Sequence, residues 1–156
     1  MKHPVSAILA QKPGQVHSVL PEASVADAIF AMNQANIGAV VVVEQEKVVG
    51  IFTERDVLRK VCFRSLEDMK LTKVSEIMTT AVITGTPETT VEEAAAFFTE
   101  KRCRHLPIIE HDKLVGLISS GDVTKWIIEQ QKTEIDHLSG YIAGDHHELK
   151  PCCDDD

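Results

Sequence analysis

Two segments of the chain, residues 18–57 and 84–123, follow one pattern without a gap. Pro21 returns as Pro87 and Asp56 as Asp122, an offset of 66 positions (87 − 21). The copies share polar residues and loop residues as well as apolar ones. A repeat of this length predicts one supersecondary unit that is built twice. The chain of 156 residues is therefore expected to fold as two half-sized units packed together.

Each copy predicts the element order strand, helix, strand, strand, helix. In the first copy, Val16–Leu20 is a short strand, and residues 25–35 carry apolar side chains at helical spacing after the N-cap residue Ser24. The second copy repeats this helix, and there Thr90 and Glu93 match a capping box. This order indicates an α/β (α+β) fold made of two β-α-β-β-α repeats.

A hairpin is expected in the second part of each copy. The β-branched run Ala39–Val43 predicts a strand that is buried on both faces, and Leu106–Ile109 is its counterpart. Pro107 inside the counterpart indicates a strand start or a sheet edge, because proline donates no backbone hydrogen bond. Short polar links lead to the return strands Val48–Phe52 and Leu114–Ile118, and a helix is expected directly after each.

The repeat extends upstream with a different spacing. Val5–Leu9 resembles Val74–Met78 at an offset of 69 (74 − 5), so the first copy carries three extra residues (69 − 66) before its first strand. A long helix from Lys125 to Ile142 and an acidic tail are expected to follow the second copy. We therefore divide the chain into a first repeat, a connector, a second repeat and a C-terminal part, at residues 4–63, 64–73, 74–130 and 131–156.

The charge and the hydropathy of the chain disfavour several classes of partner. A formal net charge of −8 argues against a nucleic-acid-binding face, which needs clustered basic residues. No apolar run approaches the length that spans a bilayer, and Met1–Pro4 is not followed by an apolar stretch of signal-peptide type. We therefore expect a cytoplasmic protein that binds neither nucleic acid nor a membrane.

The cysteines do not predict a disulfide scaffold or a metal site. Cys62 and Cys103 lie in apolar surroundings and are expected to be small buried residues, while Cys152 and Cys153 are adjacent. The tail that holds this pair also contains His146, His147 and three terminal aspartates. Their spacing matches no structural zinc pattern, so we expect a solvated tail and no metal.

One polar motif recurs in register with the core positions. Gly50, Thr53 and Asp56 return as Gly116, Ser119 and Asp122, each at the point where a strand becomes a helix. At a helix N-terminus the unpaired N–H groups favour an anion, and an aspartate there can accept hydrogen bonds from a vicinal diol. The alternative is a plain capping box, which the same residues also form.

Other candidate binding residues lie at the helix-to-strand turns. Arg104 and His105 precede the central strand of the second copy, where the first copy has Gly38 and Ala39. They are candidates for phosphate contact, although cations also complement the end of a helix. In the first copy Arg55 offers a further charged donor. Ser18 and Thr84, each three residues before a proline, are candidates for a purine edge or for local backbone hydrogen bonds.

The motifs resemble those of the CBS domain family. The resemblance rests on Val74–Met78, on Thr84 with Pro87, on Arg104–Ile108, and on Gly50–Val57 with its partner segment Gly116–Val123. It covers roughly residues 4–130, as two CBS domains in tandem, also called a Bateman module. The chain is thus similar to a stand-alone, bacterial-type CBS pair.

The resemblance implies a fold, a ligand class and an assembly. The two repeats are expected to face each other about a pseudo-twofold axis, with two non-equivalent clefts for AMP, ADP, ATP, NAD(H) or S-adenosylmethionine, and to form a homodimer. Together with the motifs, it implies a set of ligand-binding residues: Ser18, Gly38, Ala39, Thr53, Arg55, Asp56, Thr84, Arg104, His105, Pro107, Ser119 and Asp122.

Three functions follow from these observations. The first is a regulatory module that senses energy or redox state through an adenosine ligand and acts on an unidentified partner protein. The second is a structural dimerisation or interaction module that holds no nucleotide. An enzyme is the least favoured, because no nucleophile–base pair and no metal constellation recurs in the repeats, so no required cofactor and no catalytic residue are expected.

Overall fold

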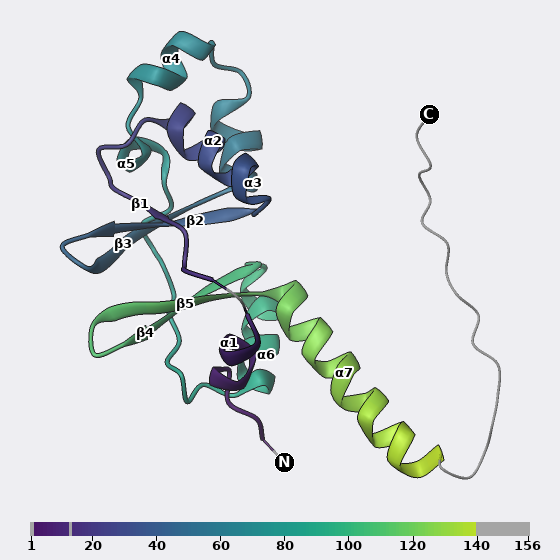
Figure 1. Ribbon diagram of the computed structural model, residues 1–156. Helices are drawn as coiled ribbons and strands as arrows, with labels where there is room; N and C mark the ends of the chain where they lie inside the picture. Colours follow the sequence, from purple (N-terminus) through teal and green to yellow (C-terminus); the bar gives the residue numbers. More distant parts are fainter. Residues whose placement is uncertain (1, 13, 140–156) are drawn as a thin grey trace, which may run out of the picture.

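The two sequence copies build two small sheets that meet at the centre of the molecule (Figure 1). The computed structural model describes residues 2–12 and 14–139. The first sheet has the order β1-β2-β3, with β1 parallel and β3 antiparallel to β2, and the second pairs β4 with β5 antiparallel. The strands are β1 (Ser18–Val19), β2 (Ala39–Glu44), β3 (Lys47–Thr53), β4 (His105–Glu110) and β5 (Lys113–Ser119). The predicted mixed α/β class and both hairpins are confirmed.

Both hairpins close with the same two-residue turn. Gln45 and Glu46 have φ angles of 51° and 66°, and His111 and Asp112 have 50° and 61°. Positive φ at both central residues defines a type I′ turn, whose twist matches that of the flanking strands. The short polar links that recur in the sequence therefore encode one turn geometry.

The first strand of each copy is shorter than the sequence predicts. β1 covers only two residues, and in the second half its counterpart is a single parallel bridge between Gly85 and Ile108. Gly85 donates its N–H to the Pro107 carbonyl over 2.9 Å and accepts from the N–H of Ile109 over 2.9 Å. The backbone polar groups of residues 107 and 109 thus point toward the outer edge of the sheet. At this edge no strand requires a backbone N–H from residue 107, so a proline is tolerated there. The predicted edge position of Pro107 is confirmed.

The helices that follow the first strands are confirmed at their predicted starts. These are α2 (Val25–Ala35) and α6 (Val91–Lys101). The Ser24 hydroxyl accepts the N–H of Asp27, and Thr90 and Glu93 form the expected reciprocal capping box.

The short helices upstream of the two copies are exchanged between the halves. α1 (Ser6–Gln11) packs against β5 and places Ile8 in the core of the second half, although it precedes the first repeat. α5 (Val74–Ile77) packs instead into the core of the first half. Val5 donates its N–H to the Thr89 carbonyl and Val74 donates to Ala23, each over 2.8 Å. The repeat boundaries proposed from the sequence therefore do not coincide with the two cores, and they remain a proposal for the division of the chain.

This exchange explains the glycine of the recurring motif. A Cβ atom at Gly50 would overlap the Met78 side chain, and one at Gly116 would overlap Leu9. Met78 follows α5, and Leu9 belongs to α1. Each glycine therefore gives a strand the room that the exchanged helix of the other copy needs.

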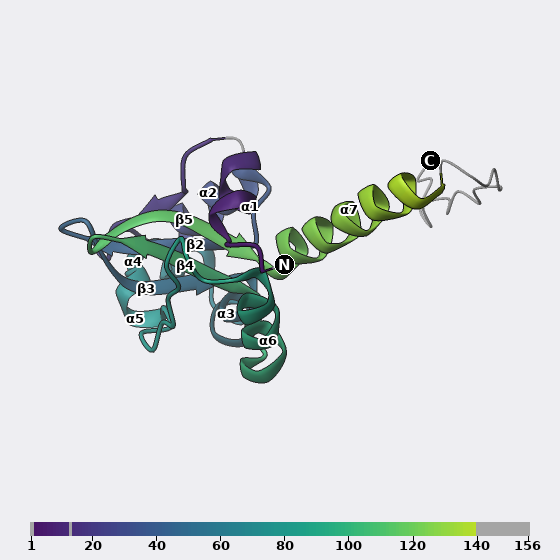
Figure 2. The same cartoon turned by 90° about the horizontal axis from the view of Figure 1, so that it is seen from below.

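Helices follow β3 and β5 directly, as predicted, but they differ from each other. After β3, α3 (Glu54–Asp56) runs into a π-helical turn, η1 (Val57–Val61), and α4 (Leu66–Leu71) lies in the connector. After β5, one helix, α7 (Ser120–Ser139), includes the long helix that was expected from Lys125, and residue 142 lies outside the described residues. Figure 2 shows α7 extending away from the body that the sheets form.

The cysteine prediction is wrong for the two residues that can be checked. Cys62 and Cys103 are both exposed, because they follow η1 and α6, where the chain turns at the surface. The Cys62 thiol donates to the Leu58 carbonyl over 2.9 Å. The tail with His146, His147, Cys152 and Cys153 lies outside the described residues. In the described part of the chain, no helix combines the length and the apolar character that crossing a membrane requires.

Candidate functional site

Both copies of the polar motif form a capping box. The Ser119 N–H donates to Asp122 Oδ2 over 2.8 Å, and the Asp122 N–H donates to Ser119 Oγ over 3.1 Å. Thr53 and Asp56 exchange the same two bonds over 3.0 and 3.3 Å. The capping interpretation therefore holds in both halves. A carboxylate accepts more hydrogen bonds than this pair supplies, so capping leaves room for a ligand contact.

The surroundings of the two aspartates differ. Asp56 is only 5% exposed, and Lys60 forms an ion pair with its Oδ1 over 3.0 Å. The hydroxyl of Thr79 lies 3.4 Å from Oδ1, and that of Thr53 donates to Oδ2 over 3.2 Å. The carboxylate of Asp56 is thus enclosed and saturated by its own half of the chain.

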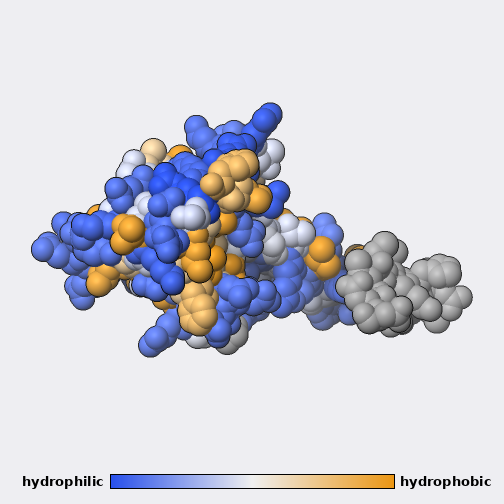
Figure 3. Space-filling model, turned by 90° about the horizontal axis from the view of Figure 1, so that it is seen from above, coloured by the Kyte–Doolittle hydropathy of each residue, from blue (hydrophilic) through white to orange (hydrophobic). Residues whose placement is uncertain are grey.

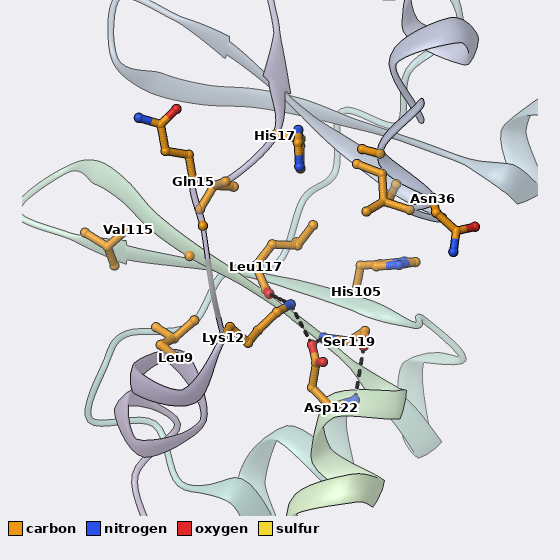
Figure 4. A pocket seen from close by; sticks show the side chains of 17 residues that line it. Leu9, Lys12, Gln15, His17, Asn36, His105, Val115, Leu117, Ser119 and Asp122 are labelled. Atoms are coloured by element: carbon orange, nitrogen blue, oxygen red, sulfur yellow. Dashed lines mark hydrogen bonds and ion pairs between the residues drawn. The ribbon is translucent and has the colours of Figure 1, made fainter. Parts of the chain in front are cut away.

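Asp122 instead faces a cavity of about 490 Å³ between the two halves (Figure 4). His105 and Ser119 line the same cavity from the second half, and Gly38 and Ala39 line it from the first. A volume of this size is typical of small-molecule sites. Five of the residues predicted from the sequence therefore meet at one place, and they come from both repeats.

The remaining predicted residues do not line this cavity. Arg55 donates to the Arg102 carbonyl over 3.1 Å, and Arg104 is exposed, with its carbonyl accepting from the Ser120 N–H over 2.9 Å. Their roles in ligand binding stay predictions, as do those of the others: Ser18, Thr53, Asp56, Thr84 and Pro107. His105 and Arg104 are separated because successive residues of an extended chain point to opposite sides.

Sequence reasoning missed the α1–β1 connector, the segment between Gln11 and Ser18, which forms one wall of the cavity. Lys12, Gln15 and His17 line it, together with Asn36 at the end of α2. Lys12 Nζ lies 2.8 Å from Asp122 Oδ2 and 2.8 Å from the Leu117 carbonyl (Figure 4). The available signal was the three extra residues of the first copy, which fall in this connector.

The α1–β1 connector also explains why the cavity is beside Asp122 and not beside Asp56. In the first half, Thr79 and Ile51 exchange both backbone hydrogen bonds, over 2.9 and 3.0 Å, so the chain after α5 lies along the edge of β3. In the second half, the carbonyl of Leu117, the counterpart of Ile51, accepts from the Lys12 side chain instead. The chain after α1 thus leaves β5 and bounds the cavity.

The charges at the cavity are arranged around Asp122. Burial opposes ionisation of this carboxyl, but the hydrogen bond and the charge of Lys12, together with the Ser119 hydrogen bonds, hold its pKa below the ordinary value. Burial lowers the pKa of His105, an effect that nearby Glu54 partly opposes. At neutral pH the cavity therefore presents an ionised Asp122 and a neutral His105.

Two interlocked β-α repeats with a cavity between them define the class of this protein, a paired-repeat module. The repeats are CBS domains: the family model described as "CBS domain" matches residues 5–62 and 74–129, and the chain belongs to that family. In the part of the chain that the structure describes, no three histidine, cysteine, aspartate or glutamate side chains cluster as metal ligands.

Individual proteins resemble the chain over most of its length. The mitochondrial CBS domain-containing protein CBSX3 of Arabidopsis thaliana is 42% identical over 126 residues, which are 78% of this chain and 61% of CBSX3. The crystal structure of the CBS domain protein NE2398 has 41% identity and a TM-score of 0.76 over 82% of this chain and 99% of that one. CBSX2, solved in complex with AMP, shares the fold at a TM-score of 0.70 and 22% identity, over 81% and 97% of the two chains.

Proposed function

We propose that this chain is a non-catalytic regulatory module that binds an adenosine-containing ligand, AMP, ADP, ATP or NAD(H), in the cavity between its CBS repeats. The observation that carries the proposal is the position of Asp122. Its carboxylate is ionised, lies at the wall of a ligand-sized cavity, and is held there by the N-terminus of α7. CBSX2 in complex with AMP has the same fold, which supports adenine nucleotides as the first ligands to test.

The cavity offers complementary groups for each part of such a ligand. Asp122 can accept from the two hydroxyls of a ribose. Apolar side chains of Leu9, Val16 and Ile37 line the walls against which a purine face can pack. The ammonium group of Lys12, paired with Asp122 over 2.8 Å, can instead pair with an anionic part of the ligand once a ribose takes its place on the carboxylate. These groups bind and orient a ligand, and we assign none of them a chemical step.

Ligand binding can be communicated because the cavity belongs to both halves. Gly38 and Ala39 line it from one repeat, and Ser119 and Asp122 line it from the other. A ligand that contacts both sides shifts the equilibrium between their arrangements by its difference in affinity for the two. We propose that an unidentified partner protein responds to this difference.

Calorimetric titration of AMP, ATP and NAD tests the proposal. Asp122→Ala should weaken the ligand that binds most tightly by at least about 10-fold, because a charge-assisted hydrogen-bond pair is lost. Glu93→Ala is the matched control, since Glu93 caps α6 in the same way and does not line the cavity. Binding that is unchanged in Asp122→Ala would remove this residue from the site, and no binding by the wild type would refute the proposal.

A second candidate function, dimerisation or partner docking, is favoured by exposed apolar side chains. Phe63 is 91% exposed and Leu71 is 82% exposed, and Leu66 lies between them on α4. Figure 3 shows apolar groups among hydrophilic ones on this face. Such groups on one surface mark an interaction site when they are contiguous. We propose that this face contributes to a homodimer. Light scattering on wild type and on a Phe63→Ser, Leu71→Ser variant tests it, and an unchanged mass refutes it.

The expected cytoplasmic location stays a prediction. CBSX3 carries the word mitochondrial in its name, and its location is not transferred to this chain. Fractionation of cells that express the tagged chain decides between the compartments.

A further inference from the structure

We infer that Lys12 makes this cavity selective for nucleotides that carry a phosphate over the corresponding nucleoside. The inference rests on the proposed function and names the ligand class that the site prefers. It concerns a residue in the connector between α1 and β1, which lies outside the recurring motif.

Lys12 is bound to the carboxylate that a ribose would need. Asp122 Oδ2 accepts from Lys12 Nζ over 2.8 Å and from the Ser119 N–H over 2.8 Å. Two hydrogen bonds fill the two lone pairs of that oxygen. A diol that binds both oxygens of the carboxylate must therefore displace Lys12 from Oδ2.

Displacement leaves a charge that the ligand has to neutralise. The side chain of Lys12 is 40% exposed, and that of Asp122 is 23% exposed, so the pair lies at the cavity wall and is partly shielded from water. Once it leaves Asp122, the ammonium group retains only the Leu117 carbonyl among its described partners. A phosphate restores an ion pair to Lys12, whereas a nucleoside has no anionic group with which to do so.

The rest of the cavity does not replace this cation. Lys12 is the only lysine or arginine among the described residues that line it. His105 is neutral near pH 7, because burial lowers its pKa. Two carboxylates are nearby. Asp122 is in the wall, and Glu54 lies against Gly38, so that a Cβ atom added to Gly38 would be 3.3 Å from Cδ of Glu54. Without Lys12 the carboxylates of Asp122 and Glu54 would repel a phosphate.

Titration of AMP and adenosine into wild type and Lys12→Met tests the inference. Wild type should bind AMP at least about 10-fold more tightly than adenosine, the effect of one charge-assisted hydrogen bond. In Lys12→Met the affinity for AMP should fall by a similar factor. Adenosine should bind equally well or better, because Asp122 is free, so that the ratio of the two affinities falls close to one.

Two further variants control this experiment. Lys12→Arg keeps the charge and should retain a preference for AMP. Lys73→Met removes the cation of an exposed ion pair with Glu22 (2.7 Å), neither residue of which lines the cavity, and should leave both affinities unchanged. Thermal melting establishes that each variant is folded.

The outcomes separate the inference from the proposed function. If wild type binds AMP and adenosine with equal affinity, or if Lys12→Met keeps the wild-type ratio, the selectivity of Lys12 is refuted while the nucleotide site stands. If wild type binds neither compound nor ATP or NAD, the proposed function and the inference are both refuted.

Discussion

Leu9 lies so close to Gly116 that a Cβ atom at position 116 would overlap the Leu9 side chain unless that side chain moved. Leu9 is carried by α1, which precedes the first repeat, and Gly116 is in β5 of the second. Met78 and Gly50 repeat this relationship in the other half. These contacts pack α1 against the sheet of β4 and β5, and α5 against the sheet of β1, β2 and β3.

Substitution of Gly116 should therefore destabilise the fold. We expect Gly116→Ala to cost about 1–3 kcal/mol, because the added methyl group forces the Leu9 side chain out of its present contact with β5. Gly121→Ala is the control, since its Cβ would meet only Ser119 Oγ at 3.6 Å and alanine favours a helix. Denaturant unfolding measures both. Equal stability of the two variants would show that the core absorbs the methyl group at no cost.

The helix exchange predicts where a core mutation acts. Ile8 is buried in the second half, and Ile77 in the first. Ile8→Ala should cost about 2–4 kcal/mol and raise hydrogen exchange mainly in β4 and β5, while Ile77→Ala should act mainly on β2 and β3. Hydrogen exchange read by mass spectrometry distinguishes them. The opposite pattern, in which each mutation affects the repeat that follows it in sequence, would contradict the exchange.

The buried position of Asp56 makes its ion pair worth more than a surface pair. Lys60→Met leaves a carboxylate that is 5% exposed without its cation, and we expect a loss of roughly 1–2 kcal/mol, discounted because Lys60 itself is 44% exposed. Lys125→Met breaks an exposed pair with Glu129 (3.9 Å) and should change stability by less than about 0.5 kcal/mol. Urea unfolding compares them, and a Lys60→Met variant as stable as Lys125→Met would refute the prediction.

Acid should destabilise the protein through His105. Its folded pKa lies below the ordinary value of 6.5, since burial disfavours the imidazolium. The unfolded chain therefore takes up this proton first, so stability is complete above about pH 6.5 and declines as the pH falls toward the folded pKa. Asp122, with a pKa held below 3.8, adds a further loss only at a much lower pH.

Melting temperatures between pH 8 and pH 5 measure this effect. His105→Gln should show a smaller decline than wild type over that range, because no buried imidazole remains to be protonated. His137→Gln, at an exposed position of α7, should follow the wild type. A wild-type slope in His105→Gln would assign the acid sensitivity to other groups.

Much of the fold is encoded locally and can be predicted. Ser24 and Thr90 start helices because a side-chain hydroxyl satisfies an N–H group a few residues away. The type I′ turns also depend on neighbouring residues. The buried positions expected for Cys62 and Cys103 are wrong because their surroundings are themselves at the surface: Phe63, next to Cys62, is 91% exposed, and Cys103 lies between Arg102 and Arg104.

The candidate site was predictable only in part. The motif pointed equally to Asp56 and Asp122, yet Lys60 and Thr79 enclose the first, while the second faces the cavity. One comparison of the repeats set Gly38 and Ala39 against Arg104 and His105. Only the fold shows that Gly38, Ala39 and His105 line the same cavity, and that Arg104 does not. Lys12 was overlooked because it lies outside the repeat.

The sequence by itself determined the repeat, its element order, the caps and turns, and the family. The tertiary structure decided which half receives each upstream helix, and through it the role of Gly50 and Gly116 and the placement of Lys12 beside Asp122. The physical reason is that caps and turns depend on contacts within a few residues. Two similar half-cores accept similar helices, so the partner of each helix is chosen by connector length and by packing between distant segments.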